Sequence, residues 1–309
     1  MVMGSLTGRD LLSMADLTAE ELQELLRLAA QLKSGALSLR CEKILGLLFY
    51  KASTRTRVSF TSAMYRLGGQ VLDLNPNVTQ VSRGEPLEDT ARVLDRYIDI
   101  LAIRTFDQHD LEKFAEYTEI PIINALSDRE HPCQVLADLQ TIQESFNTLE
   151  GITLTYVGDG SNNMAHSLLL GCALVGMNVR IASPAEYQPL EPIVQQAKAI
   201  AGDRSEVTVT TDAIAAVQGS QVVYTDVWAS MGQESSAQSR IPIFQPYQVN
   251  EQLMAHADRQ AIVLHCLPAH RGEEITNGVI EGSQSRVWDQ AENRMHAQQA
   301  LIASLLGVK

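Results

Sequence analysis

The residues best suited to chemistry are Ser53-Thr54-Arg55-Thr56-Arg57, which place two guanidinium groups among three hydroxyl groups. An apolar run over residues 44–50 precedes them, and apolar residues at helical spacing follow over residues 60–67. This pattern predicts a strand, a turn and then a helix that the motif opens. A helix N-terminus has unpaired N–H groups and a partial positive charge, so the sequence predicts a phosphate site there. A solvated basic helix start, with Ser53 as its N-cap, is the alternative.

Two further polar groups follow in the same half of the chain. Arg104 ends an apolar strand over residues 99–104, and His131-Pro132-Cys133-Gln134 opens a long amphipathic helix. Ligands of open α/β sheets bind beyond the carboxyl ends of the strands, so Arg104 is expected on the same rim as the first motif. His131 and Gln134 lie one turn apart at a helix start, where both can reach a bound anion or carbonyl group.

The second half of the chain repeats this arrangement. Asp226 follows a strand over residues 222–225, and His265-Cys266-Leu267-Pro268 follows a strand over residues 262–264. The turn Gly158-Asp159-Gly160-Ser161-Asn162-Asn163 is only loosely similar to a dinucleotide-binding turn, because Asn163 replaces its third glycine. A nicotinamide-dependent enzyme is therefore disfavoured, and an asparagine at this turn instead offers an amide to a small polar ligand.

The elements that position these residues alternate between strand and helix. The predicted strands cover residues 44–50, 70–74, 99–104 and 120–124 in the first half, and 152–157, 178–182, 207–210, 222–225 and 262–264 in the second. Helical patterns separate most of them, which favours parallel sheets. The sequence therefore predicts an α/β fold with two parallel-sheet domains, residues 1–148 and 149–288. A final helix over residues 289–307 is expected to pack back on the first domain, and the active site is expected in the interdomain cleft.

The bulk composition disfavours several classes of protein. With 309 residues, of which 45% are hydrophobic, the chain can bury two domain cores. Lys and Arg number 24 against 37 Asp and Glu, and the net charge of -13 disfavours nucleic acid and anionic membranes as partners. No signal pattern opens the chain, and its longest apolar stretch, residues 167–179, is too short to span a membrane. The cysteines lack the spacing of a zinc site and the density of a disulfide-rich domain, so a cytoplasmic protein with reduced thiols is expected.

Three motifs, in this order and at strand ends, resemble the aspartate/ornithine carbamoyltransferase family over nearly the whole chain: Ser53-Thr54-Arg55-Thr56-Arg57, His131-Pro132-Cys133-Gln134 and His265-Cys266-Leu267-Pro268. A fourth motif, Asp226-Val227-Trp228-Ala229-Ser230-Met231-Gly232, resembles the ornithine branch, because aspartate-specific members carry an Arg-x-Gln pair where this chain has Asp226 and Trp228. The resemblance implies transfer of the carbamoyl group of carbamoyl phosphate to the side-chain amine of L-ornithine, giving L-citrulline and phosphate in arginine biosynthesis. It implies neither a metal nor another cofactor.

The same resemblance implies roles for individual residues. The carbamoyl-phosphate site would comprise Ser53, Thr54, Arg55, Thr56, Gln80, Arg104, His131, Gln134, Cys266, Leu267 and Arg294. The ornithine site would comprise Asn163, Asp226, Ser230 and Met231, and the longer turn in this chain leaves Asn162 open as the alternative to Asn163. The expected catalytic residues are Arg55, Arg104, His131, Asp226, Cys266 and Arg294. Gln80 resembles a residue that reaches into a neighbouring subunit's site, which implies a homotrimer or a multiple of trimers.

Two alternatives remain open on the sequence. A sister carbamoyltransferase would accept N-acetylornithine, putrescine or aspartate, but Asp226 and Ser230-Met231-Gly232 favour free ornithine. A non-catalytic paralogue would bind carbamoyl phosphate or ornithine and regulate a partner. The joint presence of the expected catalytic residues argues against it.

Overall fold

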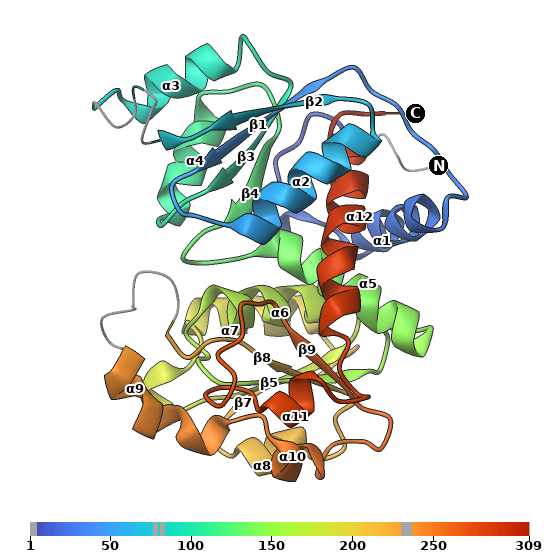
Figure 1. Cartoon of the computed structure of the whole chain (residues 1–309), viewed down its shortest axis with the longest axis vertical. Coiled ribbons are helices and arrows are strands. Elements are labelled where there is room, and N and C mark those ends of the chain that lie inside the picture. Colours follow the sequence, from blue (N-terminus) through green and yellow to red (C-terminus); the bar gives the residue numbers. More distant parts are fainter. Residues whose placement is uncertain (1–4, 77–79, 81–83, 230–236, 309) are drawn as a thin grey trace. The chain divides into compact units, whose positions relative to one another are not determined.

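The computed structural model describes residues 5–76, 80, 84–229 and 237–308, and the chain divides into two compact units (Figure 1). The first unit runs to Gln140 and includes the chain again from Glu292, and the second comprises Thr141–Ala291. Both boundaries fall within helices, α5 (Pro132–Phe146) and α12 (Val287–Leu305). Each unit contains one parallel sheet, so the predicted α/β class with two parallel sheets is confirmed.

The first unit contains four parallel strands in the order β2-β1-β3-β4. They are β1 (Ile44–Phe49), β2 (Gln70–Leu74), β3 (Ile100–Arg104) and β4 (Ile122–Leu126). β1, β3 and β4 are largely buried, whereas β2 is an edge strand with mostly accessible side chains. The chain passes from β1 to β2 on one side and then returns to β3 on the other. β1 and β3 therefore flank a topological switch point, where ligands of such sheets bind.

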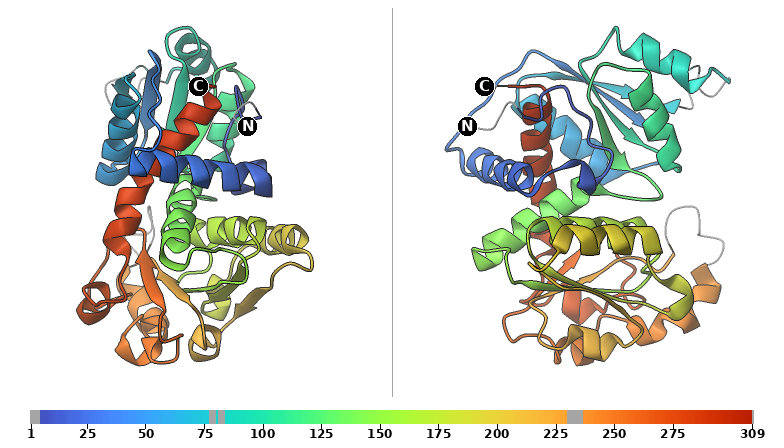
Figure 2. Two further views of the ribbon diagram at one scale, coloured as in Figure 1. Left: turned by 90° about the vertical axis from the view of Figure 1, so that its right-hand side faces the viewer. Right: turned by 180° about the vertical axis from the view of Figure 1, so that it is seen from behind.

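Helices cover both faces of this sheet (Figures 1 and 2). They include α1 (Ala19–Ser34), α2 (Thr54–Arg66), α3 (Leu87–Leu94) and α4 (Gln108–Glu116). α1 begins at the predicted capping box, in which Thr18 and Glu21 each accept a hydrogen bond from the other's backbone N–H. α3 and α4 pack on Leu48, Leu101 and Ile103 of the sheet. α12 runs beside α1 and α2, and Lys33 Nζ donates to Asn293 Oδ1 at 2.7 Å.

The second unit contains five parallel strands in the order β7-β6-β5-β8-β9. They are β5 (Thr153–Val157), β6 (Asn178–Ala182), β7 (Val207–Thr210), β8 (Val222–Thr225) and β9 (Ile262–His265). The chain builds outward from β5 to β7 and then resumes at β8 on the other side of β5. The second switch point therefore lies between β5 and β8. Asn162, Asp226 and Cys266 follow β5, β8 and β9 at this rim of the sheet.

The helices of the second unit are unequal in length. They are α6 (Asn163–Leu174), α7 (Glu191–Ala201), α8 (Ala213–Val217), α9 (Ala237–Phe244), α10 (Glu251–Met254) and α11 (Asn277–Ile280). Figure 1 shows α6 and α7 on one face of the sheet and α8, α10 and α11 on the other. The last three were not predicted, because helices of four or five residues are too short to show a periodic apolar pattern.

The predicted strands all exist, but some boundaries shift. The strand predicted at residues 120–124 is Ile122–Leu126, and the last helix begins at Val287. In the part of the chain that the structure describes, no helix has both the length and the hydropathy needed to cross a membrane.

Candidate active site

The helix N-terminus predicted to bind phosphate is present in the first unit. Ser53 is the N-cap of α2, and its Oγ accepts a hydrogen bond from the N–H of Thr56 at 3.2 Å. The first turn of α2 has no acidic side chain, so this turn supplies no counter-charge to the positive end of the helix. Thr54 is exposed there and Arg55 is half-buried. The terminus is thus suited to an anion.

The two arginines of the motif differ in their surroundings. Arg57 pairs with Asp73 of β2, and its Cζ lies 5.0 Å from the centre of the Phe49 ring. Arg57 therefore fastens α2 to the sheet. Arg55, in contrast, lies close enough to His131 for its charge to lower the pKa of that histidine.

Two expected residues, Thr56 and Gln134, meet around the guanidinium group of a third, Arg294. Its Nη2 donates to Thr56 Oγ1 at 2.8 Å, and its Nη1 donates to Gln134 Oε1 at 3.0 Å. All three side chains are buried. The contacts join α12 to the first turns of α2 and α5, which lie far from α12 in the sequence.

His131 is the buried centre of a group of positive charges. Burial, and then the guanidinium groups of Arg294, Arg104 and Arg55, hold the pKa of His131 well below its usual value. Arg104 reaches this group from the end of β3, where it pairs with Phe49 of β1. The imidazole is therefore neutral at physiological pH and can donate an N–H bond to a carbonyl oxygen. The three arginines beside it are suited to an anion.

Gln80 lies between β2 and α3, outside the helix starts just described. Its side chain is exposed, and its backbone carbonyl accepts a hydrogen bond from the N–H of Glu85 at 3.3 Å. It is therefore accessible at the surface of the first unit.

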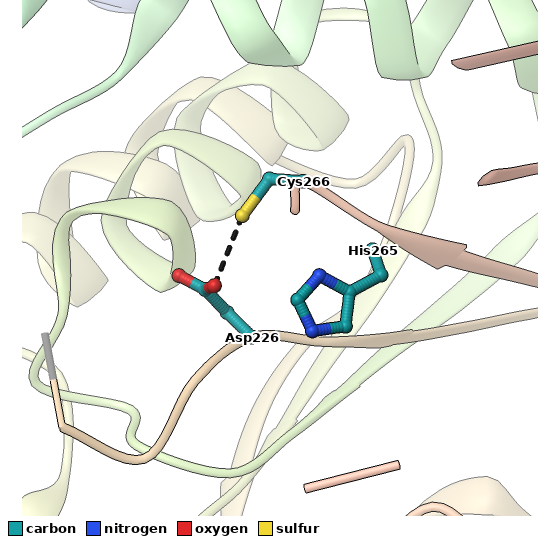
Figure 3. A group of neighbouring side chains, drawn as sticks. All are labelled: Asp226, His265 and Cys266. Carbon is teal, nitrogen blue, oxygen red and sulfur yellow. Dashed lines mark hydrogen bonds between the residues drawn. The ribbon is translucent and has the colours of Figure 1, made fainter. Parts of the chain in front are cut away.

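The second unit gathers its expected residues around Asp226 (Figure 3). Asp226 Oδ1 accepts hydrogen bonds from Cys266 Sγ at 3.0 Å and from the N–H of Val227 at 2.8 Å. Its Oδ2 accepts a bond from Asn162 Nδ2 at 3.2 Å. Burial raises the pKa of the Asp226 carboxyl group, against the opposing effects of His265 and the Cys266 hydrogen bond. A ligand ammonium group placed here would offset the cost of burying this carboxylate.

The structure distinguishes the two asparagines of the turn. Asn162 is the N-cap of α6, and its Oδ1 accepts bonds from the N–H groups of Met164 and Ala165. Its Nδ2 donates to Tyr156 Oη at 2.9 Å and to Asp226. The amide of Asn162 is thus fully used in holding the helix start and the carboxylate. Asn163 follows it at the first helical position and is half-buried.

A buried pair behind the Cys266 loop was missed by sequence reasoning. His265 Nδ1 accepts a hydrogen bond from the N–H of Leu267 at 2.9 Å, so the ring proton lies on Nε2, which contacts Glu274 Oε1 at 2.9 Å. Both side chains are fully buried. The pair holds Leu267 in a left-handed conformation with φ near 59°. No periodicity or motif marks Glu274, because it lies in an irregular loop nine residues after His265.

Asp226, His265 and Cys266 could also be considered as metal ligands, because one ligand atom of each lies within 4.8 Å of the others (Figure 3). The hydrogen bonds disfavour this, because one imidazole nitrogen accepts from Leu267 and the other contacts Glu274. A metal would have to displace one of these partners. The cluster is therefore better described as a hydrogen-bonded recognition site.

Arg240 contacts described residues that precede it in the chain. Arg240 Nη1 donates to Asp159 Oδ2 at 2.6 Å and to the carbonyl oxygen of Trp228 at 2.7 Å. Ser230 and Met231, which were expected to bind ornithine, lie outside the described residues. Sequence reasoning also missed Arg240, because an arginine in a polar stretch gives no sign that it is buried.

Both halves of the chain match domains of one known family. Residues 9–144 match the carbamoyl-P binding domain of aspartate/ornithine carbamoyltransferase, and residues 150–305 match its Asp/Orn binding domain. The chain is 73% identical over 307 residues to an ornithine carbamoyltransferase of Nostoc punctiforme, with 99% of this chain and 100% of that protein covered. A second such enzyme, from Synechocystis, is 70% identical, with 98% of both chains covered.

Solved structures agree with these sequence matches. The ornithine carbamoyltransferase of Pyrococcus furiosus superposes with a TM-score of 0.94 at 47% identity, covering 98% of both chains. That of Gloeobacter violaceus gives a TM-score of 0.89 at 54% identity, covering 96% of this chain and 98% of that one. Taken with the residues gathered at the two switch points, these matches show that the chain belongs to the aspartate/ornithine carbamoyltransferase family.

Proposed function

We propose that this protein is an ornithine carbamoyltransferase. It transfers the carbamoyl group of carbamoyl phosphate to the side-chain amine of L-ornithine and releases L-citrulline and phosphate. The observation that carries this proposal is the group at the starts of α2 and α5, where Arg294 donates to Thr56 and Gln134 and where the charges of Arg55, Arg104 and Arg294 act on His131. Such a group of cations, beside the open end of a helix, suits a substrate that carries both a phosphate and a carbonyl oxygen.

The first unit is assigned to carbamoyl phosphate. The N-terminus of α2 and the hydroxyl groups of its motif bind the phosphate, together with Arg55. Arg104, His131 and Gln134 complete the pocket. His131 donates an N–H bond to the carbamoyl oxygen, and its lowered pKa means that it does so as a neutral imidazole.

The second unit is assigned to ornithine. Asp226 attracts the cationic substrate and would repel the extra carboxylate of aspartate. Asn163 is assigned to the amino-acid end of ornithine, because the amide of Asn162 already holds Asp226 and the start of α6. Ser230 and Met231 are assigned to the same end. Cys266 and Leu267 are assigned to the reacting carbamoyl group, with Arg294.

The reaction begins when the neutral amine attacks the carbamoyl carbon. A free alkylammonium group has a pKa of about 10.4, so transfer from water into the site must favour the neutral form. Attack gives a tetrahedral intermediate, whose oxyanion is stabilised by Thr56, Arg104 and His131. The attacking nitrogen then loses a proton to the departing phosphate, the bond from carbon to the phosphate oxygen breaks, and phosphate leaves with the arginine side chains around it. Carbamoyl phosphate is a mixed anhydride and already activated, so the scheme assigns no step to a metal or redox cofactor.

We assign the reaction to arginine biosynthesis in the cytoplasm. Citrulline carries a ureido group, which one further amination converts into a guanidinium group. The reaction in this direction therefore supplies arginine synthesis.

A homotrimer, or a multiple of trimers, is part of the same proposal. α2 exposes Val58 and Tyr65, and the edge strand β2 exposes Leu72. Exposed apolar side chains on neighbouring elements are typical of a subunit interface. The exposed Gln80 is then available to complete the site of a neighbouring subunit.

The test is a citrulline assay on the purified protein with carbamoyl phosphate and ornithine. N-acetylornithine, putrescine and aspartate are run at equal concentration, with their own carbamoylated products measured. Turnover selective for ornithine is expected. Faster turnover of another acceptor would overturn the assignment of the second unit and leave the phosphate site in place. No turnover with any acceptor would favour a binding protein over an enzyme.

A further inference from the structure

Two charged neighbours fix the orientation of the Gln134 carboxamide. Its Nε2 donates to Asp138 Oδ1 at 2.8 Å, and its Oε1 accepts from Arg294 Nη1 at 3.0 Å. An ionised carboxylate only accepts hydrogen bonds and a guanidinium group only donates them. Turning the amide by 180° would therefore place its NH₂ against Arg294 and its oxygen against Asp138, with neither bond formed. The amide oxygen must lie on the side of Arg294.

The helix itself brings Asp138 to Gln134. The two residues are four apart in α5 and thus lie on the same face, one turn from each other. Both side chains are almost completely buried, so water cannot easily take the place of the carboxylate. Asp138 has no role in the reaction described above.

We propose that Asp138 is a positioning residue, which makes Gln134 present a hydrogen-bond acceptor to the substrate and so selects a carbamoyl group over an acetyl group. The inference rests on the proposed function, which places Gln134 in the carbamoyl-phosphate pocket. When the guanidinium group of Arg294 turns to an anionic substrate, Asp138 still holds the carboxamide. Gln134 then keeps its oxygen toward the ligand.

The selection follows from the chemistry of the two acyl groups. A carbamoyl NH₂ donates hydrogen bonds, whereas the methyl group of an acetyl group has nearly the same size and donates none. A buried acceptor that is aimed at this position loses its ligand partner when the methyl group replaces the NH₂. Loss of such a bond typically changes affinity by about tenfold.

The test uses two stable phosphonates that differ only in this group. Phosphonoacetamide carries the NH₂, and acetonylphosphonate carries a methyl group in its place. Their dissociation constants are measured by calorimetry with the full-length protein, and the ratio of the two is the readout. The wild-type protein is expected to favour phosphonoacetamide by about tenfold. A wild-type ratio near one would overturn the proposal.

Two substitutions separate positioning from packing. Asp138→Leu keeps a similar shape but removes the acceptor, so the ratio is expected to fall toward one. Asp138→Asn retains a carbonyl oxygen that can accept from Gln134, so the ratio is expected to stay near that of the wild type. Equal ratios for the two variants would overturn the proposal, because loss of the acceptor would then have no specific effect. If Asp138→Leu does not fold, Asp138→Ala replaces it under the same criteria.

Inorganic phosphate serves as the internal control. It has no acyl group, so its affinity should be the same in Asp138→Leu and Asp138→Asn. A parallel loss of phosphate affinity in Asp138→Leu alone would show a distorted pocket and would contradict a positioning role. The binding ratio is independent of turnover, so failure of the citrulline assay would remove the proposed enzyme activity without changing this result.

Discussion

At the scale of single residues, charge and burial set the chemistry of both half-sites. His131 is kept neutral by burial and by three arginines, and Asp226 is a buried carboxyl group whose pKa is raised by the same kind of desolvation. The first site is therefore rich in positive charge and the second offers a carboxylate. The positive charge of the first site suits a phosphate, and the carboxylate of the second suits an amine.

The lowered pKa of His131 makes the stability of the protein depend on pH. Below pH 6.5 an unfolded chain protonates this histidine whereas the folded protein does not, so the free energy of unfolding falls as the pH falls. Above that pH the residue contributes no such dependence. Between pH 7.5 and 5.5, His131 should account for a decrease of about 1 kcal/mol in the free energy of unfolding.

Urea unfolding at the two pH values measures this decrease. His131→Gln should reduce the difference between them, whereas His109→Gln, at an exposed histidine of α4, should leave it unchanged. An unchanged difference in His131→Gln would show that other groups account for the pH dependence.

Asp226→Asn should act on ornithine far more than on carbamoyl phosphate. The carboxylate is the group assigned to the cationic substrate, and hydrogen bonds to charged groups contribute about 1.5–3 kcal/mol, so kcat/KM for ornithine should fall roughly 10- to 100-fold. The dissociation constant of phosphonoacetamide should change little. Asp203→Asn is the matched control, because it makes the same charge change on the exposed surface of the second unit. If kcat/KM for ornithine and the affinity for phosphonoacetamide fall by the same factor, Asp226 is not the residue that recognises ornithine.

At the scale of elements, strand ends and helix starts place the residues, and contacts between distant elements hold them. The starts of α2 and α5 supply Thr56 and Gln134, and α12 supplies the arginine that joins them. In the second unit, Arg240 at α9 is bonded to Asp159 in the turn after β5. This buried ion pair is suitable for a stability measurement.

Arg240→Leu should destabilise the protein by about 3–5 kcal/mol, because it leaves the fully buried Asp159 without its cationic partner. Adding Asp159→Asn removes the stranded charge and keeps an oxygen for the N–H of Ser161, so much of this loss should be recovered. Denaturant unfolding of the two variants gives the comparison. If the double variant is no more stable than Arg240→Leu, the cost lies in lost packing against Tyr187 and Phe244.

At the scale of the whole molecule, the exposed apolar side chains of α2 and β2 bear on assembly. Tyr65 is 60% exposed in the single chain and, with the exposed Val58 and Leu72, gives these elements an apolar surface of the kind that a neighbouring subunit covers. Light scattering should give three times the mass of the chain, or a multiple of that value.

Tyr65→Glu should lower this mass by placing a charge in the interface, with little effect on the folding of the single chain. Ile214→Glu, at an exposed position of α8, should leave the mass unchanged. A monomeric wild-type protein would refute the trimer, and the role proposed for Gln80 would fall with it.

Features that depend on neighbouring residues could be predicted from the sequence alone. Alternating strand and helix patterns predicted two parallel sheets, and the motif at Ser53 predicted a helix start, because caps and apolar periodicity act over a few residues. The folded structure was needed to find that Arg57 pairs with Asp73, that Asn162 holds Asp226, and that Glu274 contacts His265. It likewise brought Arg294 to Thr56. Such bonds join side chains of distant segments, and they form only where packing brings a donor and an acceptor together away from water.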